Sequence, residues 1–372
     1  MLLNELEEKT QRITALLDRE DLGGVLLNAQ HTFAWLTAGG NNAVDTSREN
    51  GVASLLVTRE GKRFILANNI ETPRMLAEEV SADDFEPVGF SWQGEKAAPL
   101  AIEKAKALIE KGSRLATDIL MDGSTTAIEG KVAACRYHLT DAETERLRKL
   151  GKDAGAAMLR TIDKIAPGQT EIEIAETLRH QLSVGGMTSV VTLVAADERI
   201  ANFRHPVPSL NNWHKTLLLV TCSKRDGLIV SHSRLICVGR VPDDLKARTE
   251  AAAFVNAALL DATRPGESGT ELYNVAGRAY AACGFAADID RHHQGGAVGY
   301  KTREWVAHPQ SGEIVQPRQA FAWNPSITGT KVEETCIATA GGIEIITATP
   351  GFPQIAVTVG GTEYLSPGIL SI

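Results

Sequence analysis

Two stretches of the chain repeat one pattern of helix, turn and helix. Residues 164–178 read KIAPGQTEIEIAETL and residues 262–276 read ATRPGESGTELYNVA, so Pro167 and Pro265 are 98 residues apart. In each stretch a long helical pattern stops at a Pro-Gly pair, and a Ser/Thr-rich cap begins a second helix. The pattern predicts a duplicated α+β domain with pseudo-two-fold symmetry and a site in the cleft between its halves. A chance likeness of two Pro-Gly turns is the alternative.

Strand-like runs support the duplication, because they follow both helical pairs. The first half continues with VVTLVA and KTLLLVT, and the second half continues with AFAWNP, TCIATA and IEIIT. Helices followed by antiparallel strands within each half are typical of an α+β domain.

The first 139 residues have a different character, with helical and extended patterns in alternation. GGVLL (23–27), ASLLVT (53–58) and RFILA (63–67) predict strands. The acidic, periodic start predicts an amphipathic helix over about 3–19 rather than a signal peptide. Further helices are expected near 71–80 and 96–111, and a further strand at 114–120.

The boundary between the two regions follows from helix capping. Thr140 and Asp141 can cap a long helix whose first turn is acidic. We therefore expect a small α/β domain over 1–139 and the duplicated domain over 140–372.

Composition excludes several classes of protein. The chain has 372 residues, 43% hydrophobic and 23% charged, with a net charge of −8, which is typical of a soluble globular protein. It has no Lys/Arg-rich run to bind nucleic acid, and no apolar run approaches the roughly 18–20 residues of a membrane span. Its five cysteines are scattered and form no CxxC pair, which favours reduced thiols in a cytoplasm.

Five local motifs follow one another along the second region. They are FRHPVPS (203–209), TLLLVTCSKRDGLIVSHSR (216–234), HHQGGAVGY (292–300), AFAWNPSI (320–327) and GTKVEETCIAT (329–339). In this order they resemble segments of the creatinase/aminopeptidase P/prolidase family. The resemblance covers nearly the whole chain and implies a creatinase-like N-terminal α/β domain followed by a pita-bread domain.

The resemblance also shows where this chain departs from the family's dinuclear metal site. It places the two metal-ligating aspartates at Thr221 and His232, the metal histidine at Gly296, and the two glutamates at Asn324 and Glu333. Only Glu333 keeps its ligand type, whereas hard divalent cations favour carboxylate oxygens. We therefore expect no metal and no other cofactor. A mononuclear site that uses His232, His292, His293 and Glu333 stays open as an alternative.

The same resemblance suggests a reaction that needs no metal. Creatinase, within this family, cleaves a C–N bond with a histidine as general acid/base, and the corresponding histidine is His205. A neutral imidazole can take a proton from water near pH 7 and return it to a leaving nitrogen. The leading hypothesis is a metal-independent C–N hydrolase, a homodimer that acts on a small amide, amidine or N-substituted amino acid. A loop histidine without a role is the alternative for His205.

Three other side chains are predicted to be catalytic. His232 lies in a strand whose alternation allows its imidazole to face the cleft, although a structural histidine is equally compatible. His292 and His293 are neighbours that point to opposite faces unless the chain turns between them, so we place His292 in the cleft and His293 in packing. Glu333 is expected to orient an imidazole or to bind a cationic nitrogen, and a solvated hairpin is the alternative there.

The remaining candidates are predicted to bind substrate. Arg303 stands where the family has a proton-shuttling histidine, and arginine suits a bidentate grip on a carboxylate instead. A surface ion pair with Glu304 is the other reading of Arg303. The further candidates are Arg204, Gln294, Gly296, Glu304, Asn324 and Lys331, with Asn42 and Arg48 by resemblance in a loop that is otherwise an ordinary surface loop.

Two alternatives to the leading hypothesis stay open. One is a metallo-aminopeptidase with altered ligands that acts on Xaa-Pro peptides. The other is a catalytically inactive protein that uses the old cleft to bind a ligand or a partner.

Overall fold

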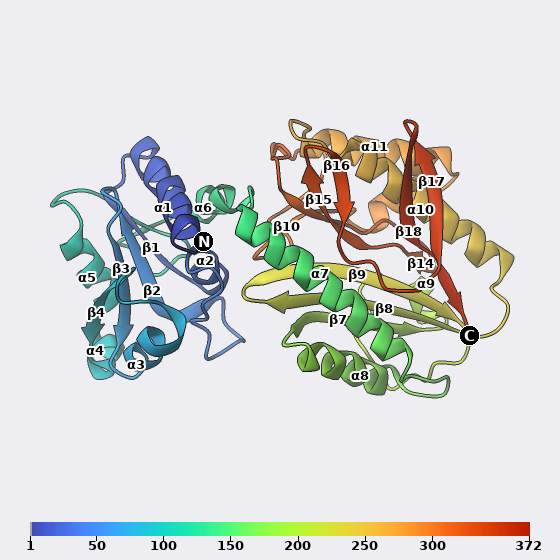
Figure 1. Cartoon of the computed structure of the whole chain (residues 1–372), viewed down its shortest axis with the longest axis horizontal. Helices are drawn as coiled ribbons and strands as arrows, with labels where there is room; N and C mark the ends of the chain where they lie inside the picture. Colours follow the sequence, from blue (N-terminus) through green and yellow to red (C-terminus); the bar gives the residue numbers. More distant parts are fainter. Residues whose placement is uncertain (1) are drawn as a thin grey trace. The chain divides into compact units, whose positions relative to one another are not determined.

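The structure, a computed structural model, describes residues 2–372 and the side chains from Glu5 onward. Contacts divide the chain into two compact units, the first ending at Arg136 and the second beginning at Tyr137 (Figure 1). No helix among the described residues is long and apolar enough to cross a membrane.

The first unit is built on a mixed six-stranded sheet. Its strand order is β4-β3-β2-β1-β5-β6, with β1 antiparallel to β2 and parallel to β5. Its strands are β1 (Gly24–Ala29), β2 (Asn50–Thr58), β3 (Arg63–Asn68), β4 (Glu86–Phe90), β5 (Leu115–Thr117) and β6 (Thr126–Ala127). Its helices are α1 (Leu2–Arg19), α2 (Gln30–Leu36), α3 (Thr72–Arg74), the π-helical η1 (Met75–Glu79), α4 (Trp92–Ala97), α5 (Leu100–Leu108) and α6 (Glu129–Arg136).

The predicted helix over 96–111 is confirmed in part, because the chain forms two helices there and not one. Helix α4 ends at Ala97, and α5 begins at Leu100. Pro99 lies between them, and proline removes a backbone donor and disfavours a helical residue before it.

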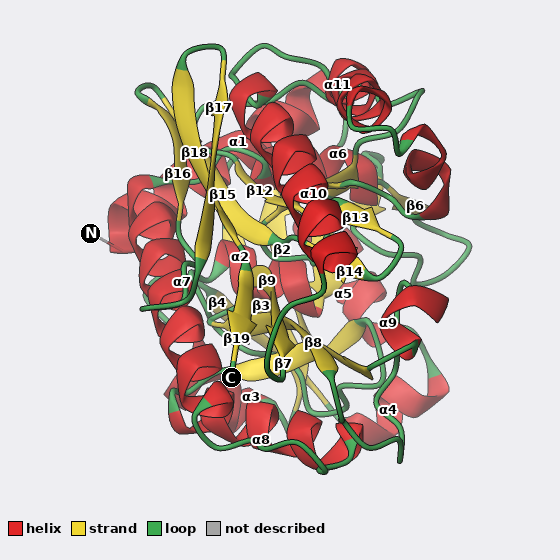
Figure 2. Ribbon diagram, turned by 90° about the vertical axis from the view of Figure 1, so that its right-hand side faces the viewer, coloured by secondary structure: helices red, strands yellow, loops and turns green. Residues whose placement is uncertain are grey.

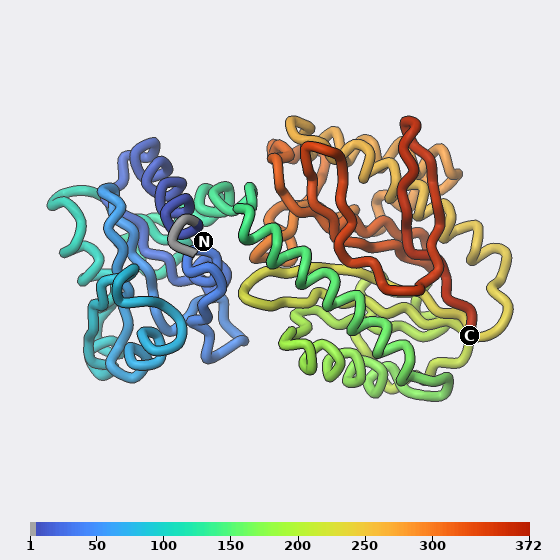
Figure 3. The backbone as a smooth tube through the Cα atoms, viewed as in Figure 1, coloured from blue at the N-terminus to red at the C-terminus, as the bar shows by residue number. Residues whose placement is uncertain are grey.

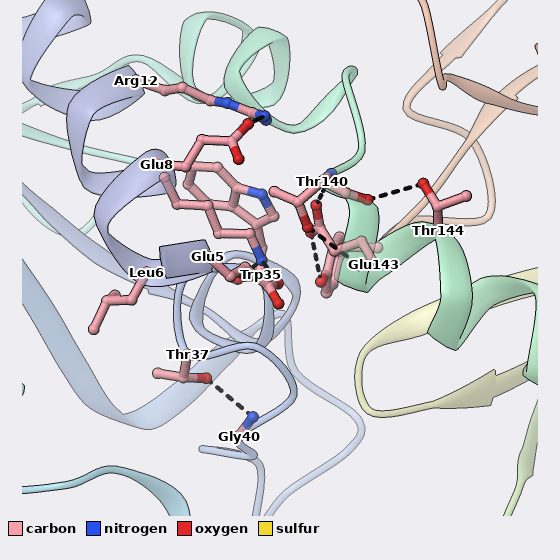
Figure 4. A network of polar contacts seen from close by, with 12 residues as sticks. Glu5, Leu6, Glu8, Arg12, Trp35, Thr37, Gly40, Thr140, Glu143 and Thr144 are labelled. Atoms are coloured by element: carbon pink, nitrogen blue, oxygen red, sulfur yellow. Dashed lines mark hydrogen bonds and ion pairs between the residues drawn. The ribbon is translucent and has the colours of Figure 1, made fainter. Parts of the chain in front are cut away.

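A buried ammonium ties α1 to α2 inside the first unit. Lys9 is fully buried, and its Nζ donates to Glu5 Oε1 and to the carbonyl of Trp35, both at 2.6 Å. Figure 4 shows Glu5 beside Trp35. Thr37, at the end of α2, accepts a hydrogen bond from the backbone of Gly40 at 3.0 Å. These contacts satisfy polar groups that would otherwise be costly to bury.

The second unit begins with the helix that the capping signal predicts. Helix α7 (Asp141–Ile162) is capped by Thr140, whose side chain accepts from the backbone of Glu143 at 3.1 Å. The carboxylate of Glu143 accepts in return from the backbone of Thr140 at 2.7 Å (Figure 4). This is a complete capping box. The other helices are α8 (Glu171–Val184), α9 (Arg199–Asn202), α10 (Asp243–Ala262), α11 (Gly269–Ala282) and the 3-10 helix η2 (Ala286–Arg291).

The duplication appears in the backbone hydrogen bonds at both Pro-Gly turns. Gly168 and Gly266 both have φ of +96°, a conformation that glycine adopts without strain. The Gly168 amide donates to Trp213 O at 2.7 Å, and the Gly266 amide donates to Val315 O at 2.9 Å. Isolated bridges repeat the relation, between Thr170 and Asn212 and between Ser268 and Ile314. The predicted pseudo-two-fold fold is confirmed, since equivalent atoms 98 residues apart make equivalent bonds.

Two sheets carry the two halves. The first has the order β19-β9-β8-β7 and the second has the order β11-β10-β12-β15-β16. The first sheet consists of β7 (Thr188–Ala196), β8 (Thr216–Arg225), β9 (Leu228–Cys237) and β19 (Ile369–Ser371). The second sheet consists of β10 (Gly295–Val298), β11 (Trp305–Val306), β12 (Ala320–Trp323), β15 (Glu334–Thr339) and β16 (Gly342–Ile345). Two further pairs of strands stand apart from these sheets. They are β13 (Ser326–Ile327) with β14 (Thr330–Lys331), and β17 (Gln354–Val359) with β18 (Thr362–Pro367).

The two halves meet along β9. Strand β9 contacts both β14 and β15, and the Ser233 amide donates to the carbonyl of Glu333 at 3.1 Å. Within the second unit, Figure 3 shows the yellow strands of the first half beside the red strands of the second. Figure 2 shows the long helices α7 and α10 lying along this layer of strands.

Helix α7 approaches the second half closely because it carries two glycines. A Cβ added to Gly151 would lie 2.4 Å from the carbonyl oxygen of Ile346, and one added to Gly155 would lie 2.3 Å from that of Ala348. Neither carbonyl can move without shifting the backbone, so the close packing depends on the missing side chains.

We predict that Gly155→Ala lowers the free energy of unfolding of the second unit by about 1–3 kcal/mol, because overpacking shifts the backbone. The matched control is Gly130→Ala in α6, where an added Cβ meets nothing within 4 Å. There the higher helix propensity of alanine should leave stability equal or raise it by up to about 1 kcal/mol. Urea unfolding followed by circular dichroism measures both, and equal effects at the two sites would contradict the packing argument.

Candidate active site

A cavity of about 130 Å³ lies in the second unit where strands of the two halves meet. It is smaller than the roughly 300–1,000 Å³ of sites that enclose a drug-sized ligand, so it suits one end of a small molecule. Its lining combines an apolar floor from β7 and β8 with polar side chains from the loops. The lining residues are Val191, Leu193, His205, Val220, Cys222, His293, Thr302, Arg303, Asn324, Lys331 and Glu333.

The strand alternation decides which residues of β8 face this cavity. Val220 and Cys222 line it, and Ser231, directly opposite Cys222 on β9, donates to its sulfur at 3.1 Å. Thr221 and His232 are paired with each other at the next position. Because successive side chains point to opposite faces of a sheet, these two lie on the other face.

His232 therefore does not line the cavity, which corrects its expected position in the cleft. Its side chain is fully buried, and neither ring nitrogen has a hydrogen-bond partner among the described residues. Burial and the nearby Arg234 hold the pKa of His232 well below its usual value. The resemblance placed the family's aspartates one residue away from the cavity side, and one residue reverses the face in a strand.

The charged centre of the cavity is Glu333, which is 2% exposed and lies between two cations. Its Oε2 lies 3.0 Å from Lys331 Nζ, and its Oε1 lies 3.3 Å from Arg303 Nη2. Burial raises the pKa of Glu333, but Lys331 and Arg303 outweigh burial, and the net pKa lies below its usual value. The carboxylate is thus ionised at neutral pH, and the centre carries one excess positive charge.

Asn324 adds an unpaired acceptor to this centre. Its backbone amide donates to the carbonyl of Gln294 at 3.0 Å, which fixes the residue beside the cavity. Its side-chain Oδ1 is buried and has no hydrogen-bond partner within the described part of the chain. A buried amide oxygen of this kind is costly until a donor reaches it.

Three imidazoles gather at the cavity edge. His292 Nε2 lies 3.1 Å from His205 Nε2, and the rings of His292 and His293 stack with centroids 4.4 Å apart. The expected positions of the two neighbours are reversed, because His293 lines the cavity as well as stacking on His292, and His292 is buried behind it. The chain bends at His292, just after η2, so the neighbouring side chains do not alternate as they would in a strand.

Neighbouring side chains hold these histidines in place. Gln294 is 1% exposed; its Oε1 accepts from the hydroxyl of Tyr280 at 2.7 Å, and its Nε2 donates to the carbonyl of His292. Arg204 binds Asp288 at 3.0 Å and Thr328 at 2.9 Å. Gln294 and Arg204 do not line the cavity; they anchor the segments that carry His292 and His205, which corrects their predicted contact with substrate.

All three imidazoles are neutral near pH 7. Burial lowers the pKa of His292 to about 2, with Lys331 adding to the effect. Burial, Arg303 and Lys331 lower the pKa of His293 to about 4. Burial and Lys331 also lower the pKa of His205, although its ring reaches solvent. Each ring can therefore offer a lone pair to a proton or to another electrophile.

The remaining candidates lie outside the cavity lining. A Cβ on Gly296 would lie 2.1 Å from Trp305 O, so this glycine serves strand packing in β10. Glu304 Oε1 accepts from the backbone of Tyr300 at 3.0 Å. Within the first unit, Asn42 is buried and donates to Ala53 O at 2.8 Å, and Arg48 is an exposed ion-pair partner of Asp45.

Sequence reasoning missed the apolar floor of the cavity. Val220, Cys222, Val191 and Leu193 line it, and Val191 and Leu193 pair with Cys222 and Val220 in the sheet. The alternation of the two strands was a usable signal, but it needed the register of β7 against β8, which includes an irregularity between Ser189 and Val191.

The cavity does not fit a pair of hard divalent cations. Among its described lining residues Glu333 is the only carboxylate, and two side-chain cations already bind it. Gly296 leaves no room for an imidazole in β10. Hard cations need several oxygen ligands, so we derive no step through a dinuclear metal centre.

A larger hollow of about 670 Å³ lies elsewhere in the second unit, between the end of α10 and strands β16 and β18. Two acidic residues line it, the exposed Glu363 and Asp261, which accepts from Arg264 and Tyr364 at 2.8 and 3.0 Å. No histidine or cysteine lies in its described lining, so the smaller cavity is the better candidate for chemistry.

Comparison with known proteins identifies the relatives of this chain. The family model described as metallopeptidase family M24 matches residues 145–347. A protein named Xaa-Pro dipeptidase from Lactobacillus delbrueckii subsp. lactis is 26% identical over 229 residues, 59% of this chain. The match spans 62% of that relative's own length.

Solved structures share the fold over most of the chain. An Xaa-Pro dipeptidase from Bacillus anthracis has a TM-score of 0.77 at 21% identity, and covers 93% of this chain and 98% of its own. Dipeptidase PepE from Mycobacterium ulcerans has a TM-score of 0.78 at 16% identity, and covers 99% of both chains. At these identities the likeness establishes the pita-bread fold alone.

We predict that Glu333→Gln destabilises the protein at pH 7 by about 3–5 kcal/mol, because it leaves the buried Lys331 and the partly buried Arg303 without their carboxylate. Since the folded pKa is lowered, the contribution of the carboxylate is present above the unfolded value of 4.5 and is lost as pH falls through the folded pKa. The difference in free energy of unfolding between wild type and variant should therefore become smaller below pH 4.5.

Urea unfolding at pH 7 and at pH 3.5 measures this difference. The control is Glu363→Gln at an exposed position of β18, which should change stability by less than about 0.5 kcal/mol at either pH. If this difference in free energy of unfolding is the same at both pH values, the ionised form of Glu333 does not stabilise the fold.

Proposed function

The chain belongs to metallopeptidase family M24, and from this membership and the cavity of its second unit we propose that it hydrolyses carbon–nitrogen bonds in small, carboxylate-bearing amides. The relative from Lactobacillus is named for Xaa-Pro dipeptides, and a dipeptide of this kind has both an amide bond and a free carboxylate. N-acyl amino acids, other N-substituted amino acids and amidines with a carboxylate belong to the same chemical class.

The excess positive charge around Glu333 is the observation that carries the proposal. Arg303 and Lys331 share one carboxylate, and Arg303 Nε is buried without a hydrogen-bond partner among the described residues. A substrate carboxylate would supply the missing charge and accept from the guanidinium. The unpaired Oδ1 of Asn324 would accept an N–H of the substrate from the same cavity.

The histidines supply the proton transfers. His205 and His293 lie at the cavity edge in the neutral form, and His205 is hydrogen-bonded to His292. In this scheme His205 takes a proton from water as its oxygen adds to the substrate carbonyl carbon. When the C–N bond breaks, the leaving nitrogen receives that proton, and the products are a carboxylic acid and an amine.

The imidazolium formed in this step is short-lived for an electrostatic reason. Burial and Lys331 oppose a positive charge on His205 most strongly, Glu333 favours it, and Arg303 opposes it more weakly. A cation that is destabilised by its neighbours returns its proton readily, which suits delivery to the leaving group. The proposal therefore needs no metal.

A binding protein without catalysis is the second candidate. It is favoured by the small volume of the cavity and by the ion pairs that already occupy its charged centre. Such a protein would bind carboxylate ligands without turnover, so a product assay separates the two candidates.

We predict that Arg303→Gln raises KM for a dipeptide substrate roughly 10–100-fold, which is the loss of one charge-assisted contact of about 1.5–3 kcal/mol. The same substrate with its carboxylate converted to an amide should be cleaved poorly by the wild type and equally poorly by the variant. Arg278→Gln, on an exposed face of α11, is the matched control and should leave KM unchanged.

We also predict that His205→Ala lowers kcat roughly 10²–10⁴-fold, the usual contribution of a general base, while the circular dichroism spectrum is kept. The control His214→Ala at an exposed position should retain full activity. Activity should persist after dialysis against a chelator. Loss of activity in the chelator, restored by Mn²⁺, would favour a metallopeptidase with altered ligands and would overturn the proposed mechanism.

A further inference from the structure

The three histidines have a second property, which is their spacing. One nitrogen from each of His205, His292 and His293 lies within 4.8 Å of the corresponding atoms of the other two. The closest pair, His292 Nε2 and His205 Nε2, is separated by 3.1 Å. Two nitrogens bound to one tetrahedral Zn²⁺ at about 2.0–2.1 Å lie roughly 3.3–3.4 Å apart, so this pair is spaced almost as two ligands of one ion.

We propose that His205, His292 and His293 form a site for a single borderline divalent cation such as Zn²⁺, with a fourth position open to water. The site lies at the edge of the cavity that holds Glu333, and it uses residues other than those expected for the dinuclear centre. Imidazole nitrogens suit Zn²⁺, whereas Mg²⁺ and Mn²⁺ favour carboxylate and carbonyl oxygens. The site should therefore select a different class of ion from a carboxylate-based centre.

Hydrogen bonds from neighbouring residues hold the backbone at two of the three histidines. Gln294 holds the carbonyl of His292 and is itself held by the Tyr280 hydroxyl. Arg204, beside His205 in the chain, is clamped by Asp288 and Thr328. His293 reaches solvent and stacks on His292, so a small rotation of its ring can complete the site.

Nearby charges make the site weaker than a closed structural zinc site. Lys331 acts on all three imidazoles, and Arg303 acts on His205 and His293, so both repel a cation there. Glu333 offsets one of these charges from the same cavity. We therefore expect reversible binding that a chelator removes, with a dissociation constant in the micromolar range.

One consequence rests on the proposed function. An imidazole that is bound to a metal through Nε2 cannot accept a proton there, so the ion would compete with the proton that His205 takes from water. Zn²⁺ should therefore inhibit the hydrolase that works without it.

Binding is tested directly, without an activity assay. The full chain, freed of metal by a chelator, is titrated calorimetrically with Zn²⁺ and, separately, with Mn²⁺. We expect one Zn²⁺ per chain, no saturable Mn²⁺ binding, and at least a tenfold loss of Zn²⁺ affinity in His293→Ala. Tetrahedral coordination of Co²⁺ should also give a strong visible absorption band that the variant lacks.

Variants guard against a loss of fold. His293 reaches solvent, so His293→Ala should keep its circular dichroism spectrum, whereas His292 is buried. His214→Ala is the control and should bind Zn²⁺ as the wild type does. No saturable Zn²⁺ binding up to 1 mM, or equal binding by wild type and His293→Ala, would overturn the site.

Activity then separates the site from the proposed function. Inhibition by one equivalent of Zn²⁺, reversed by a chelator, supports the site and its competition with the proton on His205. Activation by Zn²⁺ would keep the cation site and overturn metal-independent hydrolysis. If one Zn²⁺ binds per chain and turnover is unchanged, the expected inhibition by Zn²⁺ is wrong.

Discussion

The ion triad of Glu333 with Lys331 and Arg303 is the interaction on which the cavity depends. A carboxylate that is 2% exposed needs compensation for its lost hydration, and the two cations provide it at 3.0 and 3.3 Å. The backbone of the same glutamate accepts from Ser233 on β9. One residue thus joins the strands of the two halves and sets the charge of the cavity between them.

In the proposed function, this triad takes the place of a metal centre. A cluster of carboxylates without metal ions would repel itself, whereas one carboxylate with two side-chain cations is already compensated. The charge of this centre comes from its own side chains, two cations and one carboxylate. Binding of a carboxylate then requires no loading with an ion, only the entry of the ligand.

The sequence could predict what depends on local signals. The Pro-Gly turns at Pro167 and Pro265 mark equivalent positions because their backbone bonds lie within short segments, and the Thr140 cap marks the start of α7. The faces of strands could not be predicted so safely. His232 was expected in the cavity but lies on the opposite face of the sheet. A shift of one residue in the alignment of a strand reverses the face of every side chain. The contact of His292 and His293 depends on where η2 ends.

The position of Arg303 constrains how a proton can leave this site. Arginine stays charged at all working pH values and cannot relay a proton, so the route must pass through the histidines. Of these, His292 is buried and hydrogen-bonded to His205, while His205 and His293 reach solvent. In the proposed mechanism, proton exchange with water would therefore occur at the same rings that would hold a cation. A single ion at that edge would close the proton route and leave the carboxylate grip of Arg303 and Lys331 intact.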